Sequence, residues 1–362
     1  MTTPSLRTDA LDYRLPPELI ATRPAEPRDA ARMMVLSRSD DRIEHARVRD
    51  LPGFLQAGDA MVFNTTAVAP ARFCGRRAGT GGRVDGLFVE QLPSRRWVVM
   101  LRSNGRLHAG DAIDLLSRTG EPTPHRLELI EPHAQGWTVA LDGPLPADAV
   151  LEVVGLTPLP PYILKARHGR AVADDLDRAW YQTVYADSAQ ARSVAAPTAG
   201  LHFTGDLLAR LEAAGVRRID VTLHIGPATF RPITAATLAG HVMHAEQYSV
   251  SPEAIAALAA RTGRVFAVGS TTARTLESLP DPLPAANMLD GPVRGCTDLL
   301  IAPPDEPRHF DGLLTNFHLP RSTLLALVAA LIGLDRLQDV YAEATRRRYR
   351  FYSYGDAMLV LP

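Results

Sequence analysis

The chain has 362 residues, 46% of them hydrophobic, which is enough to bury the core of one large or two medium-sized domains. Its formal net charge of −1 excludes a strongly basic field over the whole molecule, so contact with a nucleic acid requires a local patch. The two cysteines, Cys74 and Cys296, lack metal-ligand spacing, which argues against structural zinc or a disulfide framework and favours a reducing compartment.

The N-terminal segment has no basic stretch followed by an apolar run, so we expect neither a secretory signal nor a transit peptide. Strand candidates follow at residues 33–36 and 60–63. Between residues 71 and 154, short β-prone runs are separated by Gly, Pro, Asn and Asp, a pattern typical of a small all-β barrel. These runs are residues 86–90, 97–101, 112–116, 125–130 and 136–141.

The second half of the chain alternates between strand and helix patterns. The predicted strands are residues 218–224, 264–269 and 312–316, and the predicted helices are residues 205–215, 252–261, 322–332 and 337–346. The apolar run at 324–334 is about half a membrane span long and is better explained as a buried helix. We predict an α/β fold in which a discontinuous α/β domain (1–70 plus 155–362) carries an inserted small β-barrel domain (71–154).

Several segments place polar residues at predicted strand or helix ends. In SVAAPTAGLHFT, Thr198, Gly200 and His202 lie in a turn before a helix, where free backbone N–H groups suit a carboxylate. The alternative is that Thr204 merely caps the helix. In TLHIGPATFRP, a strand runs into a turn with His224, Thr229 and Arg231, and ligands of α/β proteins gather at such strand ends. A histidine there can also be a core residue.

The segment HVMHAEQY brings together His241, His244 and Glu246. Their spacing of three and then two differs from the HExxH zinc pattern, so we predict acid–base or substrate-binding roles and no metal. A structural polar cluster is the alternative. In VGSTTARTLES, the hydroxyl groups and Arg274 suit a ribose or a carboxylate, and TNFHLP repeats the strand-end pattern with Asn316 and His318.

Near the C-terminus, RRRYRFYSYGDAML interleaves basic and aromatic residues, as phosphate neutralisation and base stacking require. The alternative is that the arginines pair with Glu343 and Asp339 on a solvated helix face. The predicted RNA-binding residues are Arg347, Arg348, Arg350, Tyr349 and Tyr352.

These segments, together with VFNTTAVAPAR, PLPPYI and YQTVYA, stand in the order and spacing of the queuosine-pathway S-adenosylmethionine:tRNA ribosyltransferase-isomerase family, which the chain resembles over nearly its whole length. The resemblance implies that the ribosyl group of S-adenosylmethionine is transferred to 7-aminomethyl-7-deazaguanine at the tRNA wobble position and isomerised. Epoxyqueuosine-tRNA, adenine and methionine are the products. S-adenosylmethionine is a co-substrate, and no other cofactor is implied. We expect a cytoplasmic monomer without membrane contact.

This reaction needs a base of near-neutral pKa for the acidic C5′ hydrogens beside the sulfonium, and donors for the methionyl carboxylate and the ribose. The acid–base set is His202, His224, His241, His244, Glu246 and His318. The substrate-binding set is Thr198, Gly200, Thr229, Arg231, Arg274, Asn316, Asn64 and Arg72. Individual roles stay open.

The chain departs from the family pattern at Thr65, Ala67 and Ala228, where an acidic or amide residue, an arginine and a glycine are usual. These departures leave open a paralogue that uses the same donor with a different acceptor, a deazapurine outside tRNA. A non-catalytic RNA-binding protein is a further alternative, but the intact polar turns argue against it. A methyltransferase is disfavoured because no glycine-rich loop follows a first strand.

Overall fold

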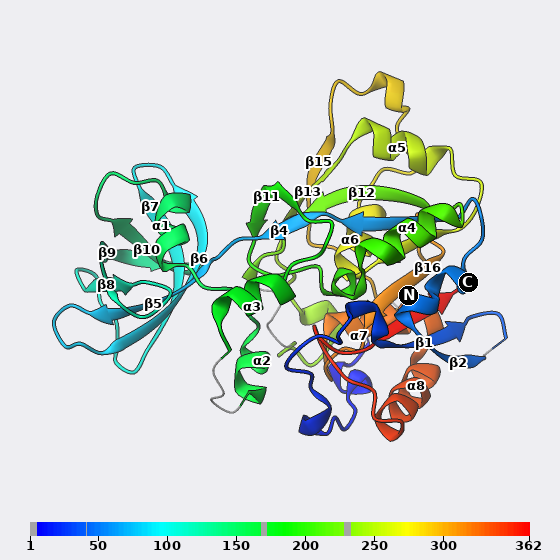
Figure 1. Cartoon of the computed structure of the whole chain (residues 1–362), viewed down its shortest axis with the longest axis horizontal. Helices are drawn as coiled ribbons and strands as arrows, with labels where there is room; N and C mark the ends of the chain where they lie inside the picture. The colour runs from blue at the N-terminus through cyan, green and yellow to red at the C-terminus, as the bar shows by residue number, and fades with distance from the viewer. Residues whose placement is uncertain (1–5, 41, 168–171, 228–232) are drawn as a thin grey trace.

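The computed structural model describes residues 6–40, 42–167, 172–227 and 233–362. It contains a large mixed sheet, a closed barrel and a small two-stranded sheet (Figure 1). The helices are α1 (Ala147–Val154), α2 (Pro161–Ala166), α3 (Asp174–Trp180), α4 (Gly205–Ala213), α5 (Pro252–Ala259), α6 (Ser270–Glu277), α7 (Thr323–Ile332) and α8 (Leu334–Arg346). Within the described residues, no helix is both long and apolar enough to span a bilayer.

The large sheet has nine strands in the order β15-β13-β12-β3-β14-β16-β17-β1-β2. Its strands are β1 (Arg32–Ser37), β2 (Ile43–Arg47), β3 (Ala60–Asn64), β12 (Arg217–Leu223), β13 (Glu246–Val250), β14 (Val265–Val268), β15 (Val293–Thr297), β16 (Gly312–Asn316) and β17 (Ala357–Leu361). The four adjacent strands β12, β3, β14 and β16 are parallel. Their carboxyl ends therefore meet along one edge.

Both faces of the sheet are buried, which explains why its central strands are continuous apolar runs. On β1 and β3, Met34 and Val62 pack in one core cluster with α5, α6, α7 and α8, while Met33 and Phe63 pack in a second cluster with α4. This alternation is the two-residue period of a strand. The predicted α/β class is confirmed, because strands and helices alternate through this half of the chain.

The barrel closes in the order β10-β7-β6-β5-β8-β9 and stands apart from the large sheet (Figure 1). Its strands are β5 (Arg72–Arg77), β6 (Arg83–Leu92), β7 (Arg96–Ser103), β8 (Ala112–Leu116), β9 (Pro122–His133) and β10 (Gly136–Leu141). Helix α1 packs in the barrel core through Val150, Leu151 and Val154. The inserted barrel is thus confirmed, whereas its division from the rest of the chain at residues 71 and 154 stays a prediction.

The expectation of five barrel strands was one short, because β5 was missed. Its sequence, RFCGRR, is mostly polar and contains a glycine. A Cβ at Gly75 would lie 2.6 Å from Cγ2 of Ile113 and 2.8 Å from the carbonyl oxygen of Asp114. The glycine permits this close strand approach and at the same time weakens the β signal in the sequence.

Candidate active site

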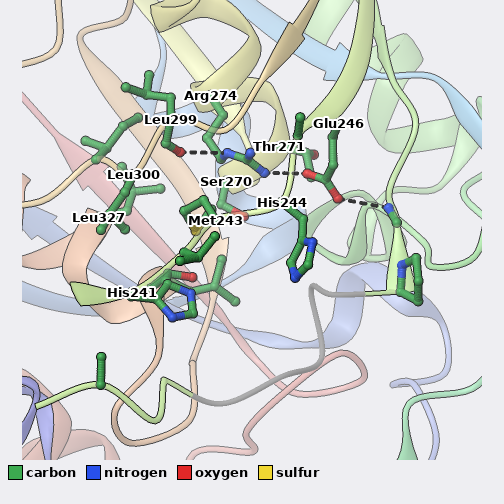
Figure 2. Close-up of a pocket in the computed structure, with 18 of the residues that line it drawn as sticks. His241, Met243, His244, Glu246, Ser270, Thr271, Arg274, Leu299, Leu300 and Leu327 are labelled. Atoms are coloured by element: carbon green, nitrogen blue, oxygen red, sulfur yellow. Dashed lines mark hydrogen bonds and ion pairs between the residues drawn. The ribbon is translucent and has the colours of Figure 1, made fainter. Parts of the chain in front are cut away.

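Two adjoining cavities lie at the carboxyl ends of the parallel strands. The larger cavity has a volume of about 540 Å³, and its walls include Gly226, the loop of residues 240–245, Arg274 and residues 299–301 (Figure 2). The smaller cavity, of about 200 Å³, has a lining that includes residues 195–199, residues 315, 316 and 318–320, Tyr162 and Tyr352.

The start of helix α6 joins these two cavities, because Ser270 and Thr271 line both of them. Gly269, with φ of +87°, turns the chain from β14 into this helix, a conformation that favours glycine. The first turn of the helix carries no acidic residue. Helix N-termini attract anions, so the shared wall suits a carboxylate.

A buried ion pair forms one wall of the larger cavity (Figure 2). The Oε2 atom of Glu246 pairs with Nη1 of Arg274, and Oε1 of Glu246 accepts a hydrogen bond of 2.9 Å from the backbone N–H of Gly226. Arg274 also donates to the carbonyl oxygens of Leu299 at 2.9 Å and Thr297 at 2.8 Å. The pair therefore ties the turn after β12 to β13, α6 and the loop after β15.

Two histidines lie on the loop that borders the larger cavity (Figure 2). His241 is half-buried and His244 is exposed. Burial, and to a lesser extent the neighbouring His244, lower the pKa of His241 below its usual value. His241 is consequently neutral near pH 7 and can accept a proton there.

Asn316 makes three hydrogen bonds in the wall of the smaller cavity. Its Nδ2 group donates to Nε2 of His202 at 3.1 Å and to the carbonyl oxygen of Tyr352 at 3.1 Å, while Oδ1 accepts from the hydroxyl of Thr198 at 3.2 Å. His202 accepts through Nε2, which fixes its neutral tautomer with the proton on Nδ1. The hydroxyl of Thr198 keeps its lone pairs as acceptors for a ligand in the cavity.

His202 and His318 are buried, and neither is suited to proton transfer at neutral pH. Burial, followed by the charges of Arg350 and Arg28, lowers the pKa of His202 to about 4. Burial alone lowers the pKa of His318 to about 3, and Nε2 of His318 lies 2.8 Å from Oγ1 of Thr315. Both rings act at neutral pH as hydrogen-bonding groups rather than acids.

These buried histidines should make the fold sensitive to acid. The unfolded chain takes up protons near pH 6.5, whereas folded His202 and His318 take them up only near 4 and 3, so the free energy of unfolding should fall as pH drops below 6.5. Urea denaturation of His318→Gln between pH 4 and 6.5 should give a slope shallower by up to about 1.4 kcal/mol per pH unit. The exposed His108→Gln control should keep the wild-type slope. An unaltered slope in His318→Gln would refute this explanation.

His224 ends a chain of buried hydroxyl groups. Its Nδ1 atom lies 3.0 Å from Oγ1 of Thr66, which lies 2.7 Å from Oγ of Ser193. Burial, with a contribution from Arg192, lowers the pKa of His224. His224 lines neither cavity. This placement favours a structural role over direct proton transfer.

Three predicted substrate-binding residues line neither cavity. Asn64 is fully buried, and its amide exchanges hydrogen bonds of 3.0 Å with the backbone of Leu223 and donates to Oγ1 of Thr271 at 3.2 Å. A Cβ at Gly200 would lie 1.9 Å from the hydroxyl of Tyr185, so its small size serves packing. Arg72 begins a barrel strand. Direct substrate contact by these three residues is therefore not supported. Thr229 and Arg231 lie outside the described residues.

The arginines of the predicted RNA-binding segment differ in exposure. Arg347 and Arg348 are exposed, and Arg347 pairs with Glu343, as does Arg346. Arg350 is partly buried and donates to the carbonyl oxygen of Arg23. Of these three arginines, Arg347 and Arg348 are exposed to a phosphate in solution, and Arg347 already pairs with Glu343.

Tyr349 and Tyr352, both predicted to bind RNA, lie in different environments, and only the burial of Tyr349 argues against stacking on a base. Tyr349 is 1% exposed, and its hydroxyl lies 2.7 Å from Nδ1 of His45. Tyr352 stacks on Tyr162 with ring centroids 3.6 Å apart and lines the smaller cavity. Their alternating aromatic pattern reflects core packing and a cavity wall.

Other sequence features also lie outside the cavities. Thr65 and Ala67, where the family pattern differs, are buried and line neither cavity, and Ala228 is outside the described residues. In the part of the chain that the structure describes, no three His, Cys, Asp or Glu side chains are grouped as metal ligands.

Two residues of the barrel, Met100 and Gln135, line the larger cavity although they were not predicted as site residues. No motif marks them in the sequence, because their proximity to the histidine loop arises only in the folded chain.

Comparison with known proteins finds relatives over nearly the whole chain. A family model described as "Queuosine biosynthesis protein" matches residues 8–360. An S-adenosylmethionine:tRNA ribosyltransferase-isomerase of Symbiobacterium thermophilum is 43% identical, with 98% of this chain and 100% of the relative covered. The protein of the same name from Sphingopyxis alaskensis is 45% identical, with 99% and 97% covered. The crystal structure of an S-adenosylmethionine tRNA ribosyltransferase from Thermotoga maritima superposes with a TM-score of 0.52 at 33% identity, covering 97% of this chain and 100% of that one.

Proposed function

The chain belongs to the queuosine biosynthesis protein family, and from this premise we propose that it transfers the ribosyl group of S-adenosylmethionine to 7-aminomethyl-7-deazaguanine at the wobble position of a tRNA and isomerises it. The family resemblance predicted from the motifs is confirmed, and the chain is an enzyme of the transferase-isomerase class. Adenine and methionine leave, and epoxyqueuosine remains in the RNA. We propose that the reaction takes place in the cytoplasm.

One observation carries this proposal: two cavities share a wall at Ser270 and Thr271. A reaction between a large donor and a base needs two adjacent binding spaces that open into one another. The N-terminus of α6 suits the methionyl carboxylate of the donor, and Thr198 offers an acceptor to a ribose hydroxyl or the adenine amino group. We propose that the donor binds against this shared wall.

The chemistry needs a base within reach of the donor. His241 and His244 border the cavity, and His241 is neutral near pH 7 because its pKa is lowered. We propose that one of these two histidines removes a C5′ proton beside the sulfonium. Glu246 is held by Arg274 and by Gly226, so we assign it to the cavity wall instead.

The reaction can be tested directly with a defined RNA. The protein is incubated with S-adenosylmethionine and a tRNA whose wobble base is 7-aminomethyl-7-deazaguanine, and a parallel sample contains the free base. Adenine and methionine should appear in a one-to-one ratio with a mass gain on the RNA nucleoside. S-adenosylhomocysteine as the main product would refute the proposal. Modification of the free base alone would support the paralogue with a different acceptor.

The exposed arginines at the end of α8 are the proposed phosphate-binding residues. Replacing Arg347 and Arg348 with alanine should weaken tRNA binding and reduce its logarithmic salt slope by roughly one unit for each phosphate that is no longer neutralised. The affinity for S-adenosylmethionine should stay within about twofold, because neither arginine lines a cavity. Filter binding at several salt concentrations measures the slope. A wild-type slope in the double variant would mean that Arg347 only pairs with Glu343 on the surface.

A further inference from the structure

The larger cavity is bordered by the barrel as well as by the α/β part of the chain. Met100 of β7 and Gln135, in the turn between β9 and β10, line this cavity together with the loop of residues 240–245. Neither residue lines the smaller cavity. Of the two cavities, the barrel therefore borders only the larger one, which His241 and His244 also border.

A glycine holds the turn that carries Gln135 against strand β7. Gly136 has φ of +146°, and a Cβ there would lie 2.3 Å from the carbonyl oxygen of Val99 and 3.1 Å from Cα of Met100. Both the backbone angle and the close approach require glycine. The backbone N–H of Gln135 also donates to Nδ1 of His133 at 3.2 Å. These interactions place Gln135 near Met100 in a defined turn.

The side chains at this border suit a flat heteroaromatic ring. The carboxamide of Gln135 has no hydrogen-bond partner among the described residues, and it offers two donors and one acceptor. Met100 is half-buried, and a thioether packs well against aromatic rings. Val242, on the histidine loop, is 77% exposed although it is apolar. Since all three residues line one cavity, the carboxamide can bind the edge of a base there while the two apolar side chains pack against its face.

We propose that the barrel recognises the acceptor base: Gln135 hydrogen-bonds to the edge of the deazaguanine ring, while Met100 and Val242 pack against the ring. This inference rests on the proposed function, because the base is the acceptor of that reaction. The exposure of Val242 favours the acceptor over the adenine of the donor, since a base carried by an RNA must enter from solvent.

The test compares tRNA recognition with donor binding in three full-length variants. Gln135→Ala removes the carboxamide, and Gln135→Glu keeps its shape but replaces the N–H donors with an acceptor. Gln91→Ala, on the exposed part of strand β6, lines neither cavity and is the matched control. Thermal unfolding of each variant tests whether its fold is intact. The rate of adenine release gives the KM for tRNA carrying the precursor base, and calorimetry gives the Kd for S-adenosylmethionine.

We expect the two Gln135 variants to raise the KM for tRNA by about 5- to 20-fold, the effect of removing one or two hydrogen bonds, with the donor Kd within about twofold of wild type. The Gln91 variant should match wild type. A wild-type KM in both Gln135 variants overturns the inference, as does a weakened donor Kd with an unchanged KM. If the wild-type protein itself releases no adenine with this tRNA, the proposed function fails and the inference fails with it.

Discussion

Replacing Glu246 with alanine should lower the free energy of unfolding by about 3–5 kcal/mol, because it leaves the charge of Arg274 buried without its carboxylate. The side chains of Glu246 and Arg274 are only 6% and 12% exposed. The same replacement removes the acceptor of the Gly226 N–H. Such a loss is a large part of the roughly 5–15 kcal/mol that is typical of a folded protein. Urea denaturation at pH 7 measures it.

An exposed ion pair supplies the control for Glu246. Arg218 and Asp220 are 2.7 Å apart with side chains 41% and 45% exposed, so Asp220→Ala should cost less than about 1 kcal/mol. Glu246→Gln keeps an oxygen for Gly226 and should fall between the two. Equal losses for Glu246→Ala and Asp220→Ala would show that the buried pair does not hold the cavity wall together.

Replacing both His241 and His244 with alanine should lower the rate of adenine release by about 10²- to 10⁴-fold, the usual contribution of a general base. The two histidines border the larger cavity, whereas His202 and His318 have pKa values of about 4 and 3 and are too weakly basic. The single variants identify which histidine acts. The activity of wild type should also fall on the acid side as His241 becomes protonated, at a pH below its usual 6.5.

Rapid-quench measurement of adenine at saturating S-adenosylmethionine and tRNA separates this effect from binding. His108→Ala, on the barrel surface, is the control and should retain the wild-type rate. A double variant of His241 and His244 that retains more than about a tenth of the wild-type rate would exclude both residues as the base.

The fold was largely predictable where packing follows a simple period. Residues 112–116, 136–141 and 312–316 form strands with the predicted limits, and the helix predicted at 322–332 begins one residue later, at Thr323. The strands β13 and β15 were missed, since EQYSV and VRGCT are short and partly polar. They form one edge of the large sheet because β13 pairs with β12 and β15 pairs with β13, and this pairing is a tertiary effect.

The site was predictable as a set of segments and less so residue by residue. The turn before a helix, the strand ends and the histidine segment all reach the cavities, through Thr198, Asn316 and His241 among others. A single sequence does not distinguish an amide that faces a cavity from one that ties strands together, as Asn316 and Asn64 show. It also gives no sign that the barrel contributes Gln135.

The two adjoining cavities should act as one reaction site with a shared wall at Ser270 and Thr271. The most direct measurement is a crystal structure of the protein with S-adenosylmethionine bound. We predict that the donor contacts Ser270 or Thr271 and leaves the part of the larger cavity beside Gln135 free for the acceptor base. A donor bound outside both cavities, or one whose adenine fills the space beside Gln135, would contradict this prediction.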